Sequence, residues 1–366
     1  MKLALREMRR RPTRFAIAAG VLTLIVVLVA FLGGLLDGLY LGSTGAISAQ
    51  RADVFVYSAS SRDSFLRSRI EPDVRRTVAA TQGVDSLAGL SIALLTASVP
   101  KQSEPADVAL IGYEQRATGI AAPPADGSAY ADRRLEDRGV DVGETVLIGR
   151  ARTPVRVAGW VEDSNYLLQG GLWMNQATWR ATVAASRPDL RVGDGVVQVL
   201  LATGAGSPAA LAKRIDAAST HATHSLTRGE AILSIPGTKQ QQATFLQIIF
   251  TTLAVAALVI GLFFSLLTIE RTGLYGVLKA LGSSTAQLFA GVVVQAVIVT
   301  AIALMVGGGL TLVLVAVAPA SIPIELTLAR SVFVIIGMFA ASIAGSAISL
   351  RRVVRIDPAS AIGTAS

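Results

Sequence analysis

Acidic and aromatic side chains beside long apolar stretches are the residues of this chain that could contact a ligand. Glu230 shortly precedes one such stretch, and Asp37 follows another inside a run of glycines. Their carboxylates could combine with the aromatic surfaces of Tyr40, Tyr166 and Trp173 to line a pocket. Single charges and aromatic residues at a membrane boundary also serve as simple anchors, which is the alternative interpretation for each of them.

The sequence contains few residues that could bind a metal ion or perform covalent catalysis. The chain contains no cysteine, which excludes disulfides and thiolate metal sites. His221 and His224 have the i, i+3 spacing of helical metal ligands, but their polar neighbours indicate an exposed loop. The phosphate-binding glycine loop and the common hydrolase motifs are absent from the sequence. We therefore expect no catalytic residue, no metal site, no cofactor in this chain and no enzyme activity.

Four apolar stretches must position these residues. Of the 366 residues, 52% are hydrophobic and 16% are charged, whereas soluble domains carry about 25% charged residues. A membrane span needs about 20 apolar residues, and the sequence predicts spans at residues 15–42, 241–269, 288–317 and 331–350. We expect an α-helical membrane protein with four transmembrane helices (1 + 3) and an extracytoplasmic α/β domain, residues 43–240, inserted between helices 1 and 2.

The distribution of charge predicts how the spans are oriented. The net charge of +8 lies in the segments 1–14, 270–287 and 351–366, whereas the long polar segment carries basic and acidic residues in equal numbers. By the positive-inside rule these three segments are cytoplasmic, and 318–330 is an external loop. The basic excess flanks spans and suits anionic lipid, so we expect membrane lipids and no nucleic acid as partners. The expected location is the cytoplasmic membrane, with both termini inside.

The segment 43–240 has the pattern of a mixed α+β domain. Alternating or β-rich runs predict strands at 52–59, 106–113, 145–161 and 195–201, the third with a hairpin turn near 150–154. A helix is predicted over 208–219, capped by Ser207.

The connection Glu270–Gln287, ERTGLYGVLKALGSSTAQ, predicts a short amphipathic helix that ends at Gly282. Such a helix could simply lie in the lipid headgroups. Its sequence resembles the coupling helix of FtsX/MacB-type (type VII) ABC transporter permeases. The tail Arg355–Ile362, RIDPASAI, is similar to the ending of those permeases, and the arrangement of one span, a large external domain and three spans is also theirs.

The resemblance implies a permease subunit that works as a homodimer with two copies of a separate ABC ATPase, which binds ATP and Mg²⁺. Residues at the matching positions would couple to the ATPase: Glu270, Arg271, Tyr275, Leu278, Lys279 and Leu281. The stretch Leu267–Lys279 is most similar to the branch of HrtB-type haem-efflux and DevC-type permeases. This implies extraction of an amphipathic molecule, haem first, from the outer leaflet, with Glu230 as a candidate ligand of the haem iron.

Other functions remain open at this point. An FtsX-like mechanotransmitter would control an external hydrolase without moving cargo, and an exporter could instead carry lipid, peptide or drug. A sensor without an ATPase is a third class.

Small residues recur every fourth position in two of the spans. Gly34, Gly38 and Gly42 share one helix face, as do Gly337, Ala341 and Gly345. This spacing lets helices approach closely, either within one chain or between two. The resemblance favours the first set as a homodimer interface.

Overall fold

The computed structural model describes residues 12–99, 104–188, 193–270, 272–319 and 322–354. The chain divides into two compact units, one of Met1–Gly38 with Ala243–Ser366 and one of Leu39–Gln242. Most of the predicted basic termini, residues 1–11 and 355–366, lies outside the described residues, as does Arg271.

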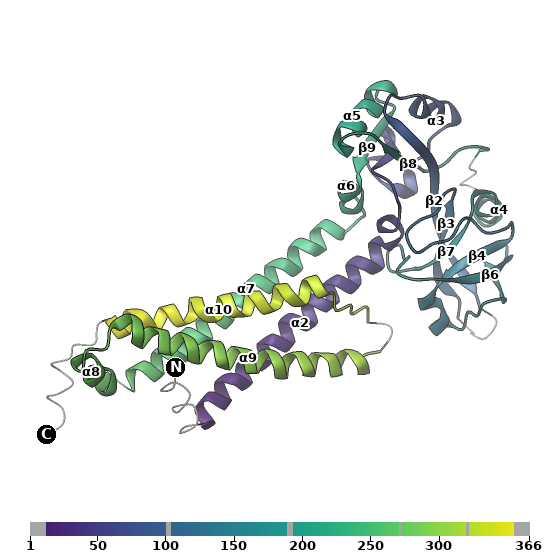
Figure 1. Ribbon diagram of the computed structural model, residues 1–366. Helices are drawn as coiled ribbons and strands as arrows, with labels where there is room; N and C mark the ends of the chain where they lie inside the picture. The colour runs from purple at the N-terminus through teal and green to yellow at the C-terminus, as the bar shows by residue number, and fades with distance from the viewer. Residues whose placement is uncertain (1–11, 100–103, 189–192, 271, 320–321, 355–366) are drawn as a thin grey trace. The chain divides into compact units, whose positions relative to one another are not determined.

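Four long helices that run side by side form the first unit (Figure 1). They are α2 (Pro12–Ser48), α7 (Thr238–Ile269), α9 (Thr285–Val317) and α10 (Leu328–Val354). Each is long and apolar enough to cross a membrane, which confirms the four predicted spans. All four begin before their predicted first residue, because a helix continues through polar residues that water or headgroups can solvate.

A common apolar core joins the four helices. Val26 of α2, Ile260 of α7, Val299 of α9 and Met338 of α10 are almost fully buried in one cluster. The outer sides of the same helices expose large aliphatic residues such as Leu24, which suit contact with lipid tails. Helices that are apolar on all sides are typical of membrane spans.

Two small residues of α10 make its contact with α7 close. A side chain at Gly337 would meet Leu253, and a Cβ atom at Gly345 would overlap the backbone carbonyl of Ala257. The four-residue spacing in the last span is therefore used for packing within the chain.

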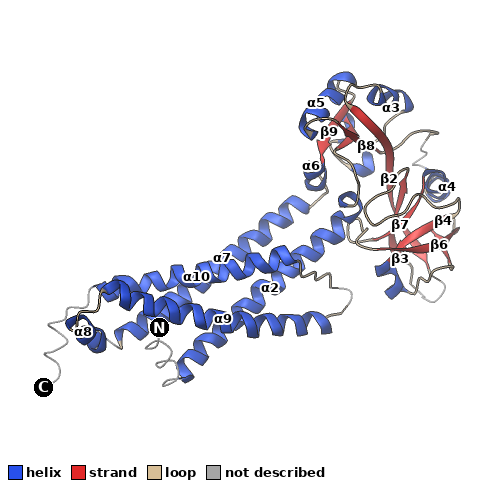
Figure 2. Cartoon of the chain, in the orientation of Figure 1, coloured by secondary structure: helices blue, strands red, loops and turns tan. Residues whose placement is uncertain are grey.

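A nine-stranded sheet is the frame of the second unit (Figure 2). Its strands are β1 (Val54–Ser58), β2 (Val84–Ser98), β3 (Ala106–Tyr113), β4 (Ser128–Asp132), β5 (Thr145–Ile148), β6 (Thr153–Val161), β7 (Gly170–Asn175), β8 (Val199–Gly204) and β9 (Thr223–Thr227). They lie in the order β3-β7-β4-β6-β5-β2-β8-β1-β9, and β2 also pairs with β3. Six strands from β3 to β2 therefore close into a ring, from which β8, β1 and β9 extend.

The long strand β2 connects the two parts of this sheet. Its first half, 84–90, pairs antiparallel with β8, and its second half, 90–97, pairs antiparallel with β3. The predicted hairpin in 145–161 is confirmed, since β5 and β6 pair antiparallel with Val146 opposite Val155. The predicted strand 195–201 instead begins at Val199, because Gly195 adopts a positive φ in the preceding turn.

In the part of the second unit that the structure describes, four α-helices and three short 3₁₀ turns cover the sheet: α3 (Pro72–Ala79), α4 (Gln176–Ser186), α5 (Pro208–Ala218), α6 (Arg228–Leu233), η1 (Ala59–Ser61), η2 (Phe65–Arg67) and η3 (Arg133–Arg138). The predicted cap of α5 is present, since Ser207 Oγ accepts a hydrogen bond from the Ala210 N–H. Leu211 and Ile215 of α5 pack against Val54 and Leu200 of the sheet. Helix α4 packs through Trp179 on the inner side of the strand ring.

Candidate functional site

A short helix, α8 (Thr272–Ala280), connects two membrane-spanning helices at one end of the bundle (Figure 1). Gly282 then turns the chain with a φ of 92°, and Ser284 caps α9 by accepting a hydrogen bond from the Gln287 N–H. Residues 285–287, predicted as part of the cytoplasmic connection, instead form the first turn of α9. The turn at Gly282 and the cap at Ser284 thus separate α8 from α9.

An ion pair connects two helices at the same end of the bundle. Arg14, near the start of α2, pairs with Glu270, directly after α7. Glu270 was predicted to contact an ATPase, but its carboxylate binds within the chain. It therefore holds α2 beside the segment that leads into α8.

The exposed face of α8 is apolar. Leu274 and Val277 of α8 and Leu281, directly after the helix, follow the i, i+3, i+7 spacing of one helix face. They are 51%, 46% and 77% exposed. Leu278 and Lys279 are half-buried, so Leu281 is the most accessible of the predicted coupling residues whose side chains the structure describes. The side chain of Tyr275, like Arg271, lies outside the described residues. An apolar stripe at a helix-bundle end needs a cover, which is either lipid or another protein.

The glycine face of α2 is occupied by the same chain. A Cβ at Gly38 would overlap the carbonyl of Pro323, and one at Gly34 would press on Ile324 and Leu326. The Glu325 N–H also donates to the Gly34 carbonyl at 2.9 Å. Gly42 lies against Leu168 within the second unit. The prediction of a homodimer interface through Gly34, Gly38 and Gly42 is therefore wrong, because no space remains for a second copy.

Asp37 forms a buried polar cluster with α10. Its Oδ1 accepts hydrogen bonds from Arg330 Nε at 3.1 Å and Nη2 at 2.9 Å, and its Oδ2 accepts one from Thr327 Oγ1 at 2.5 Å. The side chains of Asp37 and Arg330 are only 11% and 19% exposed. Both carboxylate oxygens of Asp37 are thus engaged, which gives it a structural role rather than an open position in a pocket.

The role of Arg330 as the partner of Asp37 was not predicted from the sequence. It stands alone as the one basic residue before the last apolar stretch, and a lone charge beside a span is a usable signal for a partner in another helix. Its aliphatic stem packs on Gly33 of α2. Arg330 also lines a cavity of about 210 Å³ between α2, α9 and α10, whose walls are aliphatic.

The aromatic pocket candidates do not gather at a surface. Tyr166 and Trp173 are at most 1% exposed and belong to the core of the second unit, and Tyr40 packs against that core. Trp173 stacks edge-on to Tyr113. Burial raises the pKa of Tyr166, so its phenol stays neutral. The prediction that Tyr166 and Trp173 line a substrate pocket is wrong, because both fill the interior.

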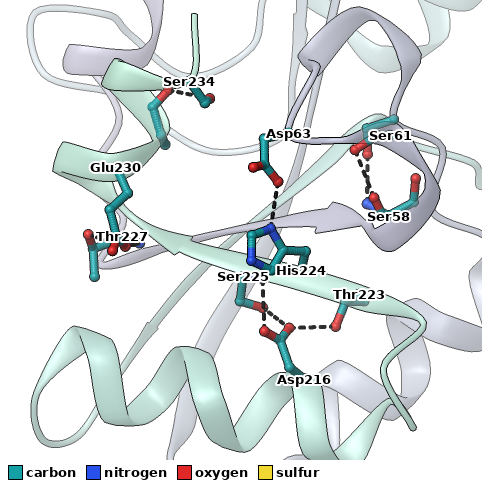
Figure 3. A network of polar contacts seen from close by, with 12 residues as sticks. Ser58, Ser61, Asp63, Asp216, Thr223, His224, Ser225, Thr227, Glu230 and Ser234 are labelled. Carbon is teal, nitrogen blue, oxygen red and sulfur yellow. Dashed lines mark hydrogen bonds and ion pairs between the residues drawn. The ribbon is translucent and has the colours of Figure 1, made fainter. Parts of the chain in front are cut away.

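Glu230 lies exposed in the first turn of α6 (Figure 3). Its Oε2 accepts hydrogen bonds from Thr227 Oγ1 at 2.7 Å and from the Thr227 N–H at 2.9 Å. These bonds hold the pKa of Glu230 below its ordinary value. The carboxylate therefore stays ionised, and both bonds use the same oxygen.

The histidines lie in a more ordered place than predicted. His221 is in a turn, but His224 is part of β9, where Nδ1 lies 2.5 Å from Asp63 Oδ1 (Figure 3). Pairing of β9 with β1 explains why this polar stretch is not a loop. Within the described part of the chain, no group of three histidine, aspartate or glutamate residues is arranged to hold a metal ion.

The sequence of the chain is similar to those of ABC transporter permeases. The family model "FtsX-like permease C-terminal" matches residues 247–358. An "Uncharacterized ABC transporter permease" of Mycobacterium tuberculosis is 27% identical over 98% of both chains. A "Putative hemin transport system permease protein HrtB" of Staphylococcus epidermidis is 20% identical over 99% of both chains. Among solved structures, the periplasmic region of MacB from Actinobacillus actinomycetemcomitans covers 52% of this chain and 94% of its own, at 12% identity and a TM-score of 0.36.

Proposed function

We propose that the chain is an ABC transporter permease of the FtsX/MacB type, which couples a separate ATPase to movement of an amphipathic molecule. The observation that carries the proposal is α8, a short helix with an exposed apolar stripe between two membrane helices. A partner ATPase that docks on this stripe could transmit its movement to α7 and α9 directly.

The proposed orientation places α8 in the cytoplasm. The start of α2 and the end of α10 lie at the same end of the bundle as α8 (Figure 1). The sequence concentrates its excess of lysine and arginine next to this end, in the positive-inside pattern. In the proposed assembly two copies of the chain work with two ATPase subunits in the cytoplasmic membrane. Surfaces other than the glycine face of α2 would join the copies.

We expect the double substitution Val277→Asp with Leu281→Asp to uncouple the ATPase. Two carboxylates on the apolar stripe would have to be desolvated in the interface, so transport-coupled ATP hydrolysis should fall by about tenfold or more. The measurement is ATP hydrolysis by the permease–ATPase complex in lipid vesicles. Val142→Asp is the matched control for Val277, since Val142 is 51% exposed and Val277 is 46% exposed but Val142 lies in the other unit, and it should leave hydrolysis unchanged. Normal hydrolysis in the double variant would reject the docking role of α8.

We propose haem as the cargo, with Glu230 as an oxygen ligand of its iron. The similarity to a staphylococcal hemin transport system permease supports this cargo class. An exposed carboxylate that stays ionised, with Thr227 bonded to only one of its oxygens, is suited to bind iron weakly. Weak ligation suits transport, because cargo must leave the site after each cycle.

The haem site is tested by absorption spectroscopy of the purified full-length protein. We expect a high-spin spectrum of oxygen-ligated haem that Glu230→Ala removes and that His221→Ala and His224→Ala leave intact. Thr227→Val separates ligation from helix capping, since it removes one hydrogen bond to Glu230 but keeps the carboxylate. This variant should still bind haem. A spectrum that depends on the histidines would contradict the assignment of Glu230. If the protein binds no haem, the haem proposal is rejected and lipid or peptide becomes the proposed cargo.

A further inference from the structure

A cavity of about 300 Å³ opens in the second unit where α4, β2 and the η2 turn meet. Its walls are apolar and come from Leu66, Leu94, Leu95, Trp179 and Val183. Leu94 and Leu95 are only partly buried although they lie on a central strand, because the cavity leaves them uncovered. Cavities of small-molecule sites begin at about 300 Å³ and are walled in this way, with few polar groups.

Arg69 is the main polar group of this cavity. Its Nη1 donates to the carbonyls of Leu66 at 3.0 Å and Ser68 at 2.7 Å, which fixes the guanidinium at the wall. Among the described residues it forms no ion pair with a carboxylate. Burial lowers the pKa of Arg69, because it withdraws part of the charge from water. A half-buried cation of this kind favours an anion.

Arg187 is a second arginine among the residues that line the cavity. It follows α4 directly, and its N–H donates to the Val183 carbonyl at 2.7 Å, so the backbone position is fixed. Gln198 also lines the cavity and is held by the hydrogen bond that its Oε1 accepts from the Ile92 N–H. The cavity therefore combines rigid apolar walls with two arginine side chains.

We propose that this cavity binds a small amphiphile with a carboxylate at one end. The carboxylate lies at Arg69 and Arg187, and the apolar chain lies along Leu94, Leu95 and Trp179. Guanidinium groups match carboxylates in geometry and charge, and the apolar walls exclude a purely polar anion. The site goes beyond the proposed transport function, since it needs neither the ATPase nor haem.

Quenching of tryptophan fluorescence by 8-bromooctanoate tests this site in the full-length protein, held in lipid nanodiscs. Bromine quenches a tryptophan that it contacts, and Trp179 lines the cavity whereas Trp173 is enclosed in a different core cluster. We expect saturable quenching by 8-bromooctanoate that Trp179→Phe removes. The neutral analogue 8-bromooctanol should show no saturable phase, because it cannot pair with arginine.

Charge variants test the role of Arg69. Arg69→Gln should raise the dissociation constant about tenfold, as expected for loss of a charged hydrogen bond. Arg67→Gln removes the same charge two residues away on the exposed side of η2, and it should leave binding unchanged. Arg187→Gln is a second variant should Arg69→Gln fail to fold. The proposal would be overturned if the arginine variants bound 8-bromooctanoate as tightly as the natural protein, or if 8-bromooctanol bound saturably. It would also be overturned if 8-bromooctanoate did not quench Trp179 saturably.

Discussion

Replacing Gly38 with alanine is expected to destabilise the helix bundle by about 3 kcal/mol, the upper part of the usual range for an overfilled core. The added Cβ would overlap the Pro323 carbonyl, and backbone cannot rotate aside as a side chain can. The segment 323–326 would have to leave α2, with loss of the hydrogen bond from the Glu325 N–H to Gly34. Thermal unfolding of the purified protein in detergent measures this effect.

Gly20 of the same helix provides the matched control. A Cβ at Gly20 meets no atom within 4 Å. Gly20→Ala should therefore be neutral, or stabilise by up to about 1 kcal/mol through the higher helix propensity of alanine. Equal melting temperatures for Gly38→Ala and Gly20→Ala would contradict the packing of 323–326 on α2.

Replacing Asp37 with asparagine is expected to cost about 3–5 kcal/mol, because it leaves the Arg330 guanidinium buried without its counter-charge. The substitution keeps the shape of the side chain, so the loss reports mainly on charge. Arg330→Gln should destabilise to a similar extent, since it strands the carboxylate instead.

The double variant Asp37→Asn with Arg330→Gln completes a thermodynamic cycle. Two neutral amides can bond to each other, so the double variant should be clearly more stable than the sum of the single losses predicts. Unfolding in detergent, followed for all four proteins, measures the coupling. Strictly additive losses would show that the two residues do not act as a pair.

The membrane spans could be predicted because long apolar stretches have few alternatives. Contacts between residues that are far apart in the sequence could not be predicted. Asp37 and Arg330 are 293 positions apart, and only the packing of α2 on α10 brings them together. The same packing explains the error at Gly34 and Gly38, since spacing alone does not distinguish a partner helix from a loop of the same chain.

Several strands of the second unit also gave weak signals. In β2 the sequence VDSLAGLSIALLTAS has no strict alternation, because the middle of this central strand, residues 88–93, is buried on both faces. The strand β9, THSLT, contains polar residues that favour turns, and it is held by its ladder with β1. Tyr166 and Trp173 illustrate the same limit, since an aromatic residue in the core cannot be told from one in a pocket by its type.

The chemical accessibility of position 281 tests most directly whether α8 docks an ATPase in the cytoplasm. The natural chain has no cysteine, so a Leu281→Cys variant carries a single reactive thiol. Its reaction with a membrane-impermeant maleimide is followed in inverted and in right-side-out membrane vesicles, with and without the co-expressed ATPase. We predict fast labelling in inverted vesicles only, and strong protection when the ATPase is bound. Labelling in right-side-out vesicles, or equal labelling with and without the ATPase, would contradict the coupling function.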